Sequence, residues 1–219
     1  MNNRDYKNSS KDGIYHIYNR GNDKINIFKN SEDYSFFTFR IRQYLFPEES
    51  LSIPGSRIVP LPDKSFSLLC YCLMPNHFHM MIRQNTELPI SALMLRLMTS
   101  YSKYFNTKYK RVGHVFQDRY KQVPVIGNKQ LLWLSAYIHQ NPKKAKIVSD
   151  SLKYDWSSYQ DYLSHQSFSL VTGSELILDQ FKTRKEYGHF VDDSYKLLDE
   201  KEELREVLMS DEISEGVSK

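Results

Sequence analysis

Four segments of this chain have patterns of apolar and polar residues that predict β-strands, two by alternation and two as apolar runs. The first segment, residues 13–19, alternates around tyrosine and isoleucine. Two more apolar segments, residues 65–72 and 77–83, are separated only by the short turn 73–76, so they predict a hairpin. Residues 119–126 alternate basic or polar with apolar side chains and predict a last extended segment.

Two helices are predicted before that last segment, from apolar residues three or four positions apart. Residues 31–45 fit this spacing imperfectly but are rich in aromatic side chains. A clearer stripe follows Pro89, which is expected in the first turn of its helix, with Asn85 or Thr86 as the cap. The stripe consists of Ile90, Leu93, Met94, Leu97, Tyr101, Tyr104 and Phe105.

A third helix is predicted from Gly127 to about Gln140. We expect it to end at Asn141-Pro142, because proline cannot continue a helix interior. Residues 47–64 contain four prolines and a glycine and predict a long loop.

The predicted order is strand, helix, hairpin, helix, strand, helix. This order predicts an α+β domain in which helices pack on one side of an antiparallel sheet. We expect residues 1–164 to form this domain and residues 165–219 to form a C-terminal helical appendage with an acidic tail. Three roles stay open for the appendage: binding DNA, packing on the core, or self-association.

Composition indicates a globular protein rather than a disordered or membrane-spanning one. Of the 219 residues, 40% are hydrophobic and 26% are charged, and no apolar run approaches the roughly 18 residues that cross a bilayer. The first residues contain no hydrophobic stretch typical of a secretion signal. Two cysteines, Cys70 and Cys72, are too few for a four-cysteine zinc site or a disulfide framework. We therefore expect a cytoplasmic protein without a membrane partner.

The charge distribution and the aromatic content indicate a nucleic-acid surface. Residues 101–150 contain ten lysines and arginines against two aspartates, whereas residues 181–219 contain seven against eleven acidic residues. Aromatic residues make up 14% of the chain. Nucleobases stack on aromatic rings and phosphates pair with lysine and arginine, although a basic face is also compatible with simple solubility.

A pair of histidines gives the first candidate for chemistry. His77 and His79 flank Phe78 on a predicted strand, so both imidazoles lie on one face of the sheet. Two neighbouring imidazoles can bind one divalent metal ion. Histidines at this spacing also occur as ordinary strand residues, so the pair alone leaves both interpretations open.

The third predicted helix provides a further donor and a nucleophile. Tyr137 and Asn141 are four residues apart and share one helical face. An amide oxygen from Asn141 is a hard donor suited to Mg²⁺ or Mn²⁺. The Tyr137 hydroxyl can form a covalent intermediate if it is activated. A buried core tyrosine at a helix end is the simpler alternative.

These residues lie in motifs that resemble a known family. The stretch YCLMPNHFH at residues 71–79 resembles the His-hydrophobe-His strand of the single-tyrosine HUH transposases. Its sequence is particularly similar to that of the REP-associated tyrosine transposases. The other motifs follow in the family's order: YH and RGN within 15–22, FQDRYK at 116–121, YIHQNP at 137–142 and WSSY at 156–159. Asp118 stands where the family pattern has glycine. The resemblance covers roughly residues 12–163.

The resemblance implies a fold and a reaction. Proteins of this family have a ferredoxin-like antiparallel sheet and cleave single-stranded DNA beside palindromic hairpins, with a divalent metal such as Mg²⁺ or Mn²⁺. A tyrosine, here Tyr137, attacks the phosphodiester and forms a 5′-phosphotyrosine link. By position, His77, His79 and Asn141 are the metal ligands. The family includes monomers and homodimers, so the oligomeric state stays open.

DNA contacts are predicted by residue type and by motif. Basic side chains next to the motifs can neutralise phosphates, a contribution that does not depend on sequence. The predicted DNA-binding residues are Arg20, Asn22, Gln117, Arg119, Lys121, Lys143 and Lys144.

Two other functions remain as alternatives. The first is a non-catalytic module that binds single-stranded nucleic acid on the same type of sheet. Binding alone requires none of the histidines, the tyrosine or the asparagine, which argues against it. The second is a metal-dependent nuclease that uses an activated water, for which Tyr137 would be dispensable.

Overall fold

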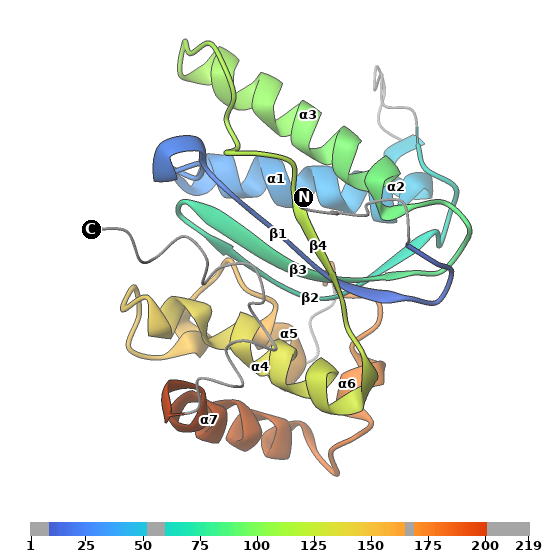
Figure 1. Ribbon diagram of the computed structural model, residues 1–219, viewed down its shortest axis with the longest axis vertical. Coiled ribbons are helices and arrows are strands. Elements are labelled where there is room, and N and C mark those ends of the chain that lie inside the picture. The colour runs from blue at the N-terminus through green and yellow to red at the C-terminus, as the bar shows by residue number, and fades with distance from the viewer. Residues whose placement is uncertain (1–8, 52–59, 165–168, 201–219) are drawn as a thin grey trace, which may run out of the picture.

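The computed structural model describes residues 9–51, 60–164 and 169–200 (Figure 1). Its centre is a four-stranded antiparallel sheet with the strand order β2-β3-β1-β4. The strands are β1 (Ile14–Arg20), β2 (Phe66–Met74), β3 (His77–Gln84) and β4 (Lys121–Pro124). Together with the helices α1 (Ser31–Leu45) and α3 (Ile90–Lys108), they follow the order β-α-β-β-α-β of a ferredoxin-like fold. The predicted α+β fold class is confirmed.

The hairpin between β2 and β3 is tighter than the sequence predicted. Leu73 and Met74, expected in the turn, continue β2 and pair with Phe78 and His77. Only Pro75 and Asn76 remain to make the turn. The loop after β1 holds this turn from the side, because the Gly21 N–H donates to the Asn76 carbonyl oxygen at 2.7 Å.

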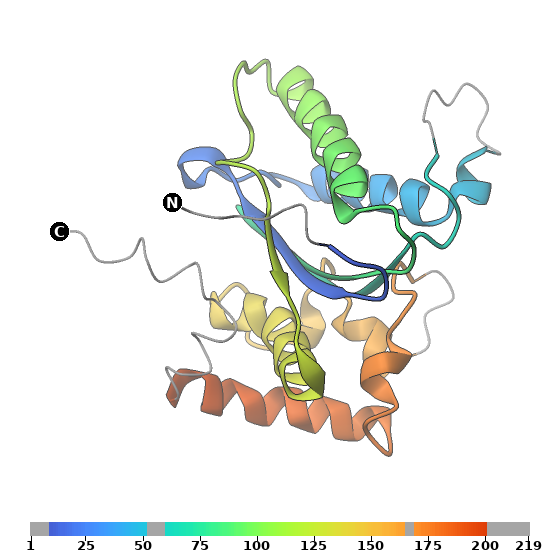
Figure 2. The same ribbon diagram turned by 45° about the vertical axis from the view of Figure 1, so that its right-hand side comes forward.

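Helices cover both faces of the sheet, whereas the pattern predicted them on one face (Figure 2). α1 and α3 pack on the first face against Ile17, Phe78 and Met80. The second face carries α4 (Gly127–Lys144) and three further helices. These are α5 (Tyr159–Leu163), α6 (Glu175–Leu178) and α7 (Arg184–Glu200). The reason lies in β2, whose side chains are apolar on both sides, so neither face can be left to water.

The structure differs from the predictions at two helix ends, the start of α3 and the end of α4. α3 begins at Ile90 with Pro89 at the cap position, and the Thr86 hydroxyl instead accepts from the Leu88 N–H in a preceding turn. α4 continues through Pro142 to Lys144. This is tolerated because proline lies in the last turn, where the missing N–H leaves only the Ile138 carbonyl oxygen without its helical partner.

The predicted loop 47–64 begins with a short helix, α2 (Pro47–Leu51). Proline at the first position and two glutamates in the first turn favour a helix start there. Glu49 also pairs with Arg42 of α1 at 2.7 Å. Residues 52–59 of this loop lie outside the described residues.

The C-terminal helix α7 packs against α4. Tyr187 and Val191 are fully buried in the same apolar cluster as Leu134 and Ile138 of α4. Packing on the core is therefore the role that the structure gives to this part of the appendage, and the boundary at residue 164 stays a prediction. Within the described ranges, none of the helices has the length and hydrophobicity required to cross a membrane.

Candidate active site

A ladder of polar and aromatic side chains lies on the face of the sheet that α4 covers. In the register of β1 and β3, Arg20 is opposite His77, and Tyr18 is opposite His79. The two histidine rings have their centroids 5.0 Å apart at an interplanar angle of 87°. His77 and His79 therefore lie on one face of the sheet, as the alternation along the strand predicted, and Phe78 points into the core on the other face.

His79 is buried, with 1% of its surface exposed. Its Nδ1 lies 3.0 Å from Nε2 of His16, in a hydrogen bond between β1 and β3. Its Nε2 has no hydrogen-bond partner among the described residues, although it is buried. A buried nitrogen without a partner is costly, so this atom is available for a ligand that the protein itself does not supply.

His77 is arranged in a similar way. Its Nδ1 lies 2.6 Å from Oδ1 of the neighbouring Asn76. A hydrogen bond with the side chain of Asn141 also reaches His77, which brings the end of α4 to the histidine pair. Both histidines therefore use Nδ1 for a contact within the protein.

Tyr137 lies on α4 directly over the pair. Its ring centroid is 5.5 Å from that of His79, and the two rings meet edge to face. Only 5% of its surface is exposed. Because Tyr137 and Asn141 are one helical turn apart, α4 places both beside the histidines. All four predicted site residues come together within one chain.

Burial keeps the histidines neutral. Burial, and to a smaller extent the charge of Arg20, lowers the pKa of His77 to about 4, although the hydrogen bond with Asn141 acts in the opposite direction. Burial also holds the pKa of His79 well below its ordinary value, with smaller contributions from His77, His16 and Arg20. Neutral imidazoles have a free nitrogen lone pair, which is the form that binds metals.

The donor set fits a divalent metal ion. Two imidazole nitrogens and one amide oxygen suit Mn²⁺, and Mg²⁺ would favour the oxygen donor. The buried and unpartnered Nε2 of His79 is the observation that points to such a ligand. No group of three or more His, Cys, Asp or Glu residues in the described part of the chain could hold a metal, the surroundings of the histidine pair included, so a third donor would have to be the amide oxygen of Asn141.

The structure brings several of the predicted DNA-binding residues to one edge of the sheet. The Gln117 N–H donates to the Arg20 carbonyl oxygen at 2.9 Å, and the Asn22 N–H donates to the Val115 carbonyl oxygen at the same distance. Lys121 begins β4 opposite Tyr18. The RGN and FQDRYK motifs, almost a hundred residues apart, are therefore adjacent in space. Lys143 and Lys144 lie in the last turn of α4.

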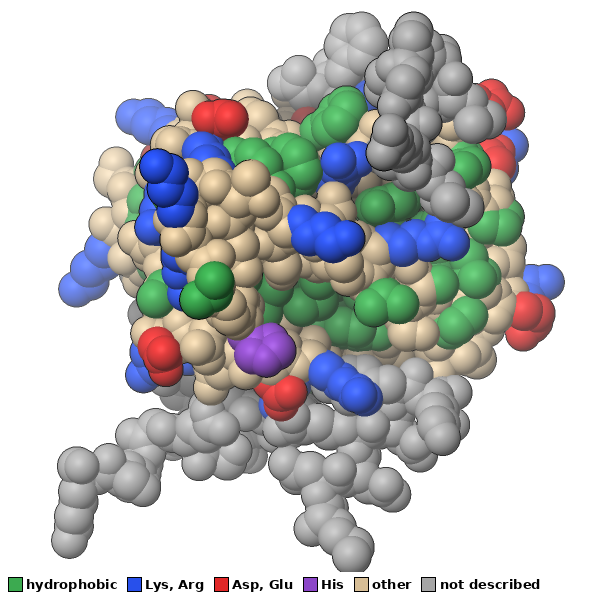
Figure 3. Space-filling view, turned by 90° about the horizontal axis from the view of Figure 1, so that it is seen from above, with side chains coloured by type: hydrophobic (Ala, Val, Ile, Leu, Met, Phe, Trp, Pro, Cys, Tyr) green, Lys and Arg blue, Asp and Glu red, His purple; other side chains and the backbone are tan. Residues whose placement is uncertain are grey.

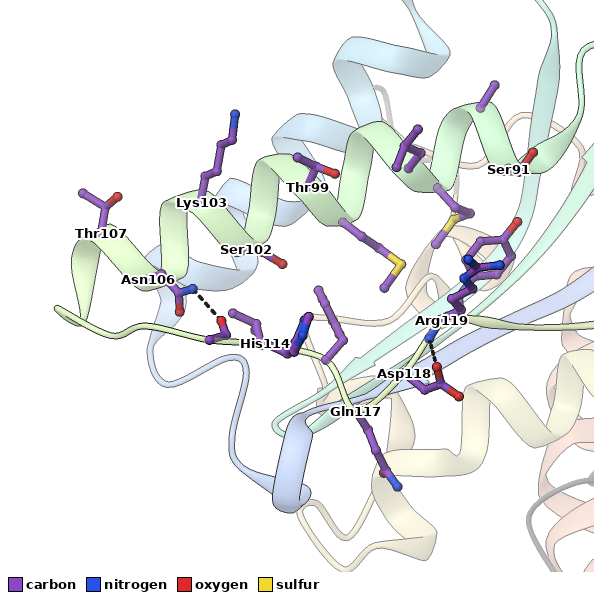
Figure 4. Close-up of a pocket in the computed structure, with 18 residues that line it drawn as sticks. Ser91, Thr99, Ser102, Lys103, Asn106, Thr107, His114, Gln117, Asp118 and Arg119 are labelled. Carbon is purple, nitrogen blue, oxygen red and sulfur yellow. Dashed lines mark hydrogen bonds between the residues drawn. The ribbon is translucent and has the colours of Figure 1, made fainter.

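A groove of about 1170 Å³ runs between α3 and residues 113–120, on the other face of the sheet (Figure 4). Its lining contains many apolar side chains and also the basic side chains of Lys103 and Arg119. The apolar lining includes Met94, Met98, Val115, Phe116 and Tyr120. Gln117 projects away from α3. The face on which α3 lies shows lysines and arginines among exposed apolar side chains (Figure 3).

Two buried polar residues, one in contact with His79 and one next to Asn141 in the sequence, were not predicted from the sequence as candidates. His16 belongs to the YH motif, but nothing in its spacing connects it to His79, 63 residues later. Gln140 is 2% exposed, and neither atom of its amide group has a partner among the described residues. It follows Tyr137 by three positions, so helical spacing alone could have placed it near that residue.

Comparison with known proteins gives one family match and a similar solved structure. Residues 61–141 match the sequence family described as "Transposase IS200 like", a range that contains all four candidate residues. A solved structure of a REP-associated tyrosine transposase bound to a REP hairpin has a similar fold, with a TM-score of 0.52 at 12% sequence identity. The similarity covers 76% of this chain and 88% of that one. No curated protein matches the sequence.

Proposed function

Because this chain belongs to the IS200-like transposase superfamily, as its motifs predicted, we propose that it cleaves and rejoins single-stranded DNA through Tyr137. A transposase-like activity on DNA follows from the family and the fold. The nucleophile, the metal and the hairpin substrate are our proposal. The observation that supports them best is the unpartnered Nε2 of buried His79 beside the Tyr137 ring.

In the proposed reaction, the Tyr137 hydroxyl oxygen attacks a backbone phosphorus atom. The new bond between the tyrosine oxygen and phosphorus forms as the bond from phosphorus to the 3′ oxygen breaks. The phenol proton passes to water and the 3′ oxygen takes one up, which leaves a 5′-phosphotyrosine and a free 3′-hydroxyl. Attack by a 3′-hydroxyl on this link rejoins DNA without another energy source.

His77, His79 and Asn141 would hold a divalent ion, Mg²⁺ or Mn²⁺. When bound, such an ion polarises the phosphodiester and stabilises charge on its oxygens. The protein's own part is to bury the histidines as neutral ligands and to fix Tyr137 above them on a rigid helix. Arg20, directly opposite His77, is suited to bind the phosphate under attack.

The proposed substrate is a DNA hairpin with an unpaired flank. The related structure contains a REP hairpin, and the cleaved strand has to be unpaired to reach a side chain as buried as Tyr137. The edge formed by Arg20, Asn22 and Gln117, with Arg119 and Lys121, is basic and continuous with the histidine face. Lys143 and Lys144 add positive charge next to Asn141 on the helix. We propose that the enzyme works on DNA in the cytoplasm.

The test is a covalent-adduct assay on a denaturing gel. The wild type is incubated with Mn²⁺ and a labelled hairpin with single-stranded flanks taken from next to the gene. We expect a protein–DNA adduct that is absent in the Tyr137→Phe variant and in chelator. Tyr71→Phe is the matched control, since Tyr71 is also buried and also lies in a family motif, but packs on the opposite face of the sheet.

The outcome separates the alternatives. DNA cutting that persists in Tyr137→Phe contradicts the tyrosine mechanism and supports a nuclease that uses an activated water. Tight binding of the hairpin without cutting, by wild type with Mn²⁺ and across a panel of flanking sequences, supports a non-catalytic binding module.

A further inference from the structure

We infer that His16 is a positioning residue that holds His79 in the form able to bind a metal ion. This inference rests on the proposed function, because it concerns the metal site of that reaction. It assigns a role to a buried histidine that is not itself a proposed ligand. His16 lies on β1, and His79 on β3.

The two rings are placed for a direct contact. His79 is opposite Tyr18 in the register, so His16 is its diagonal neighbour on the same face of the sheet. The ring centroids are 5.2 Å apart and the planes are within 21° of parallel. The Nε2 of His16 lies 3.0 Å from the Nδ1 of His79. With 3% and 1% exposure, neither ring has water as a ready alternative partner.

This contact couples the tautomers of the two rings. A hydrogen bond between two neutral imidazoles needs one N–H and one lone pair. If His79 donates from Nδ1, its Nε2 has a free lone pair and can bind a metal. If His16 donates instead, the proton of His79 is on Nε2, and that nitrogen cannot be a ligand.

The surroundings of His79 favour the first arrangement once an ion binds. Nε2 of His79 and Nδ1 of His16 are both buried without a partner among the described residues, so without an ion either arrangement leaves one buried N–H without an acceptor. An ion at Nε2 of His79 needs the lone pair of that nitrogen and therefore selects the first arrangement. Metal-binding histidines generally donate their other N–H to a neighbouring acceptor, which fixes the ring and raises the basicity of the ligand. Here the acceptor is Nε2 of His16, where other proteins use a carboxylate or a carbonyl group.

His77 serves as an internal comparison. Its Nδ1 contacts Oδ1 of Asn76, an acceptor on the adjacent residue. The two proposed ligands therefore each have an Nδ1 contact, one made locally in the turn and one made across the sheet. Only the contact of His79 depends on a residue far away in the sequence.

The first experiment needs no substitution. Long-range ¹H–¹⁵N spectra of the ¹⁵N-labelled protein at neutral pH report which nitrogen of each histidine carries the proton. We expect the Nδ1–H tautomer for His79 and an unprotonated Nε2 in His16 when diamagnetic Mg²⁺ is present. A proton on Nε2 of His79 under these conditions overturns the inference.

The second experiment measures Mn²⁺ affinity by electron paramagnetic resonance of the free ion. We expect His16→Phe, which keeps the ring shape but has no acceptor, to bind Mn²⁺ about 10–100-fold more weakly. His16→Gln should recover most of the affinity, because its amide oxygen can accept from Nδ1 of His79. The control Met81→Leu changes the residue opposite His16 on the same face and should leave the affinity unchanged.

Three results distinguish this inference from the proposed function. If wild type binds Mn²⁺ and His77→Ala does not, but His16→Phe binds as wild type does, the inference is wrong and the proposed site stands. If His16→Gln is as weak as His16→Phe while both unfold at the wild-type urea concentration, the acceptor role is wrong. If wild type itself binds no Mn²⁺, the metal part of the proposed function is wrong, and the inference falls with it.

Discussion

Arg20 and His77 are directly opposite each other where β1 and β3 meet the hairpin turn, on the face that α4 covers. The guanidinium charge is close enough to help lower the pKa values of both His77 and His79. A cation beside a candidate metal site is unfavourable for the metal alone. It becomes favourable when an anionic phosphate lies between them, so this pair is more readily explained by a phosphodiester substrate than by metal binding alone.

Replacing Arg20 by Gln should therefore weaken DNA binding while helping metal binding. With one phosphate contact fewer, the slope of log affinity against log salt concentration should fall by about 1. The affinity for Mn²⁺ without DNA should stay equal or rise, because a positive charge next to His77 is removed. Fluorescence anisotropy with a labelled hairpin in the Tyr137→Phe background measures the first effect. An unchanged salt slope would show that Arg20 does not contact phosphate.

Gly21 should not tolerate a side chain. A Cβ at this position would collide with the Ile25 carbonyl oxygen and come within 2.9 Å of the Ile27 side chain. We expect Gly21→Ala to reduce the free energy of unfolding by about 1–3 kcal/mol, as overpacking usually does. Urea denaturation measures this change. Gly188→Ala is the control, since its Cβ would meet the Leu163 side chain at 3.3 Å and the Tyr159 hydroxyl at 3.8 Å, and a helix gains up to about 1 kcal/mol from alanine.

Much of the fold followed from local patterns, and the errors have physical reasons. The helix at 31–45 and the hairpin were predicted because their signals are local: apolar spacing and a short turn. The covering of both faces was not predicted, since the choice of face depends on where α4 and α7 return to the sheet. Proline in the last turn of α4 shows that a residue which usually stops a helix is tolerated where few N–H groups are needed.

The Tyr187 hydroxyl should be a major contributor to the packing of α7 on α4. It lies 2.7 Å from His139 Nδ1 and 3.1 Å from the Ser135 hydroxyl, all of them buried. Tyr187→Phe leaves His139 Nδ1 without this partner, whereas the Ser135 hydroxyl still donates to the Leu132 carbonyl oxygen, and should cost about 1–3 kcal/mol of unfolding free energy. Tyr159→Phe, which loses only a 3.5 Å contact with the Gly188 carbonyl oxygen, should cost less than about 1 kcal/mol. Equal losses in urea denaturation would contradict this role.

The candidate site was predictable only in part. His77 and His79 share a face by strand alternation, and Tyr137 and Asn141 share one by helical spacing, so each pair could be found within its own element. The packing of α4 over β3 brings the two pairs together, and this tertiary contact was expected only from the family resemblance. His16 was missed because a contact across a sheet has no signature in sequence spacing.

The stability of the protein should fall as the pH falls below about 6.5. Burial lowers the pKa of His16 and His139 to about 3 and of His77 to about 4, and places that of His79 well below 6.5. Between these values and 6.5 the unfolded chain takes up protons that the folded chain does not, so acid favours unfolding. Each histidine contributes up to about 1.4 kcal/mol per pH unit.

Urea titrations at pH 7.5, 6.0 and 5.0 measure this dependence. His16→Gln removes one of the four groups and should make the fall in stability with acid shallower. The same slope in wild type and variant would show that His16 is protonated in the folded protein or is exposed to water.

Asn141 should contribute to metal binding directly rather than through the fold. Its side chain hydrogen-bonds to His77 at the end of α4, where an amide oxygen can also face an ion held by the histidines. Asn141→Ala removes that oxygen, and we expect it to weaken Mn²⁺ binding at least about tenfold. Mutation of residues that only hydrogen-bond to metal ligands already lowers metal affinity by about 10–100-fold. Lys129→Ala, at the exposed start of the same helix, is the control for general effects on α4. Mn²⁺ binding that is unchanged in Asn141→Ala would leave His77 and His79 as the ligands and return Asn141 to a role in orienting His77.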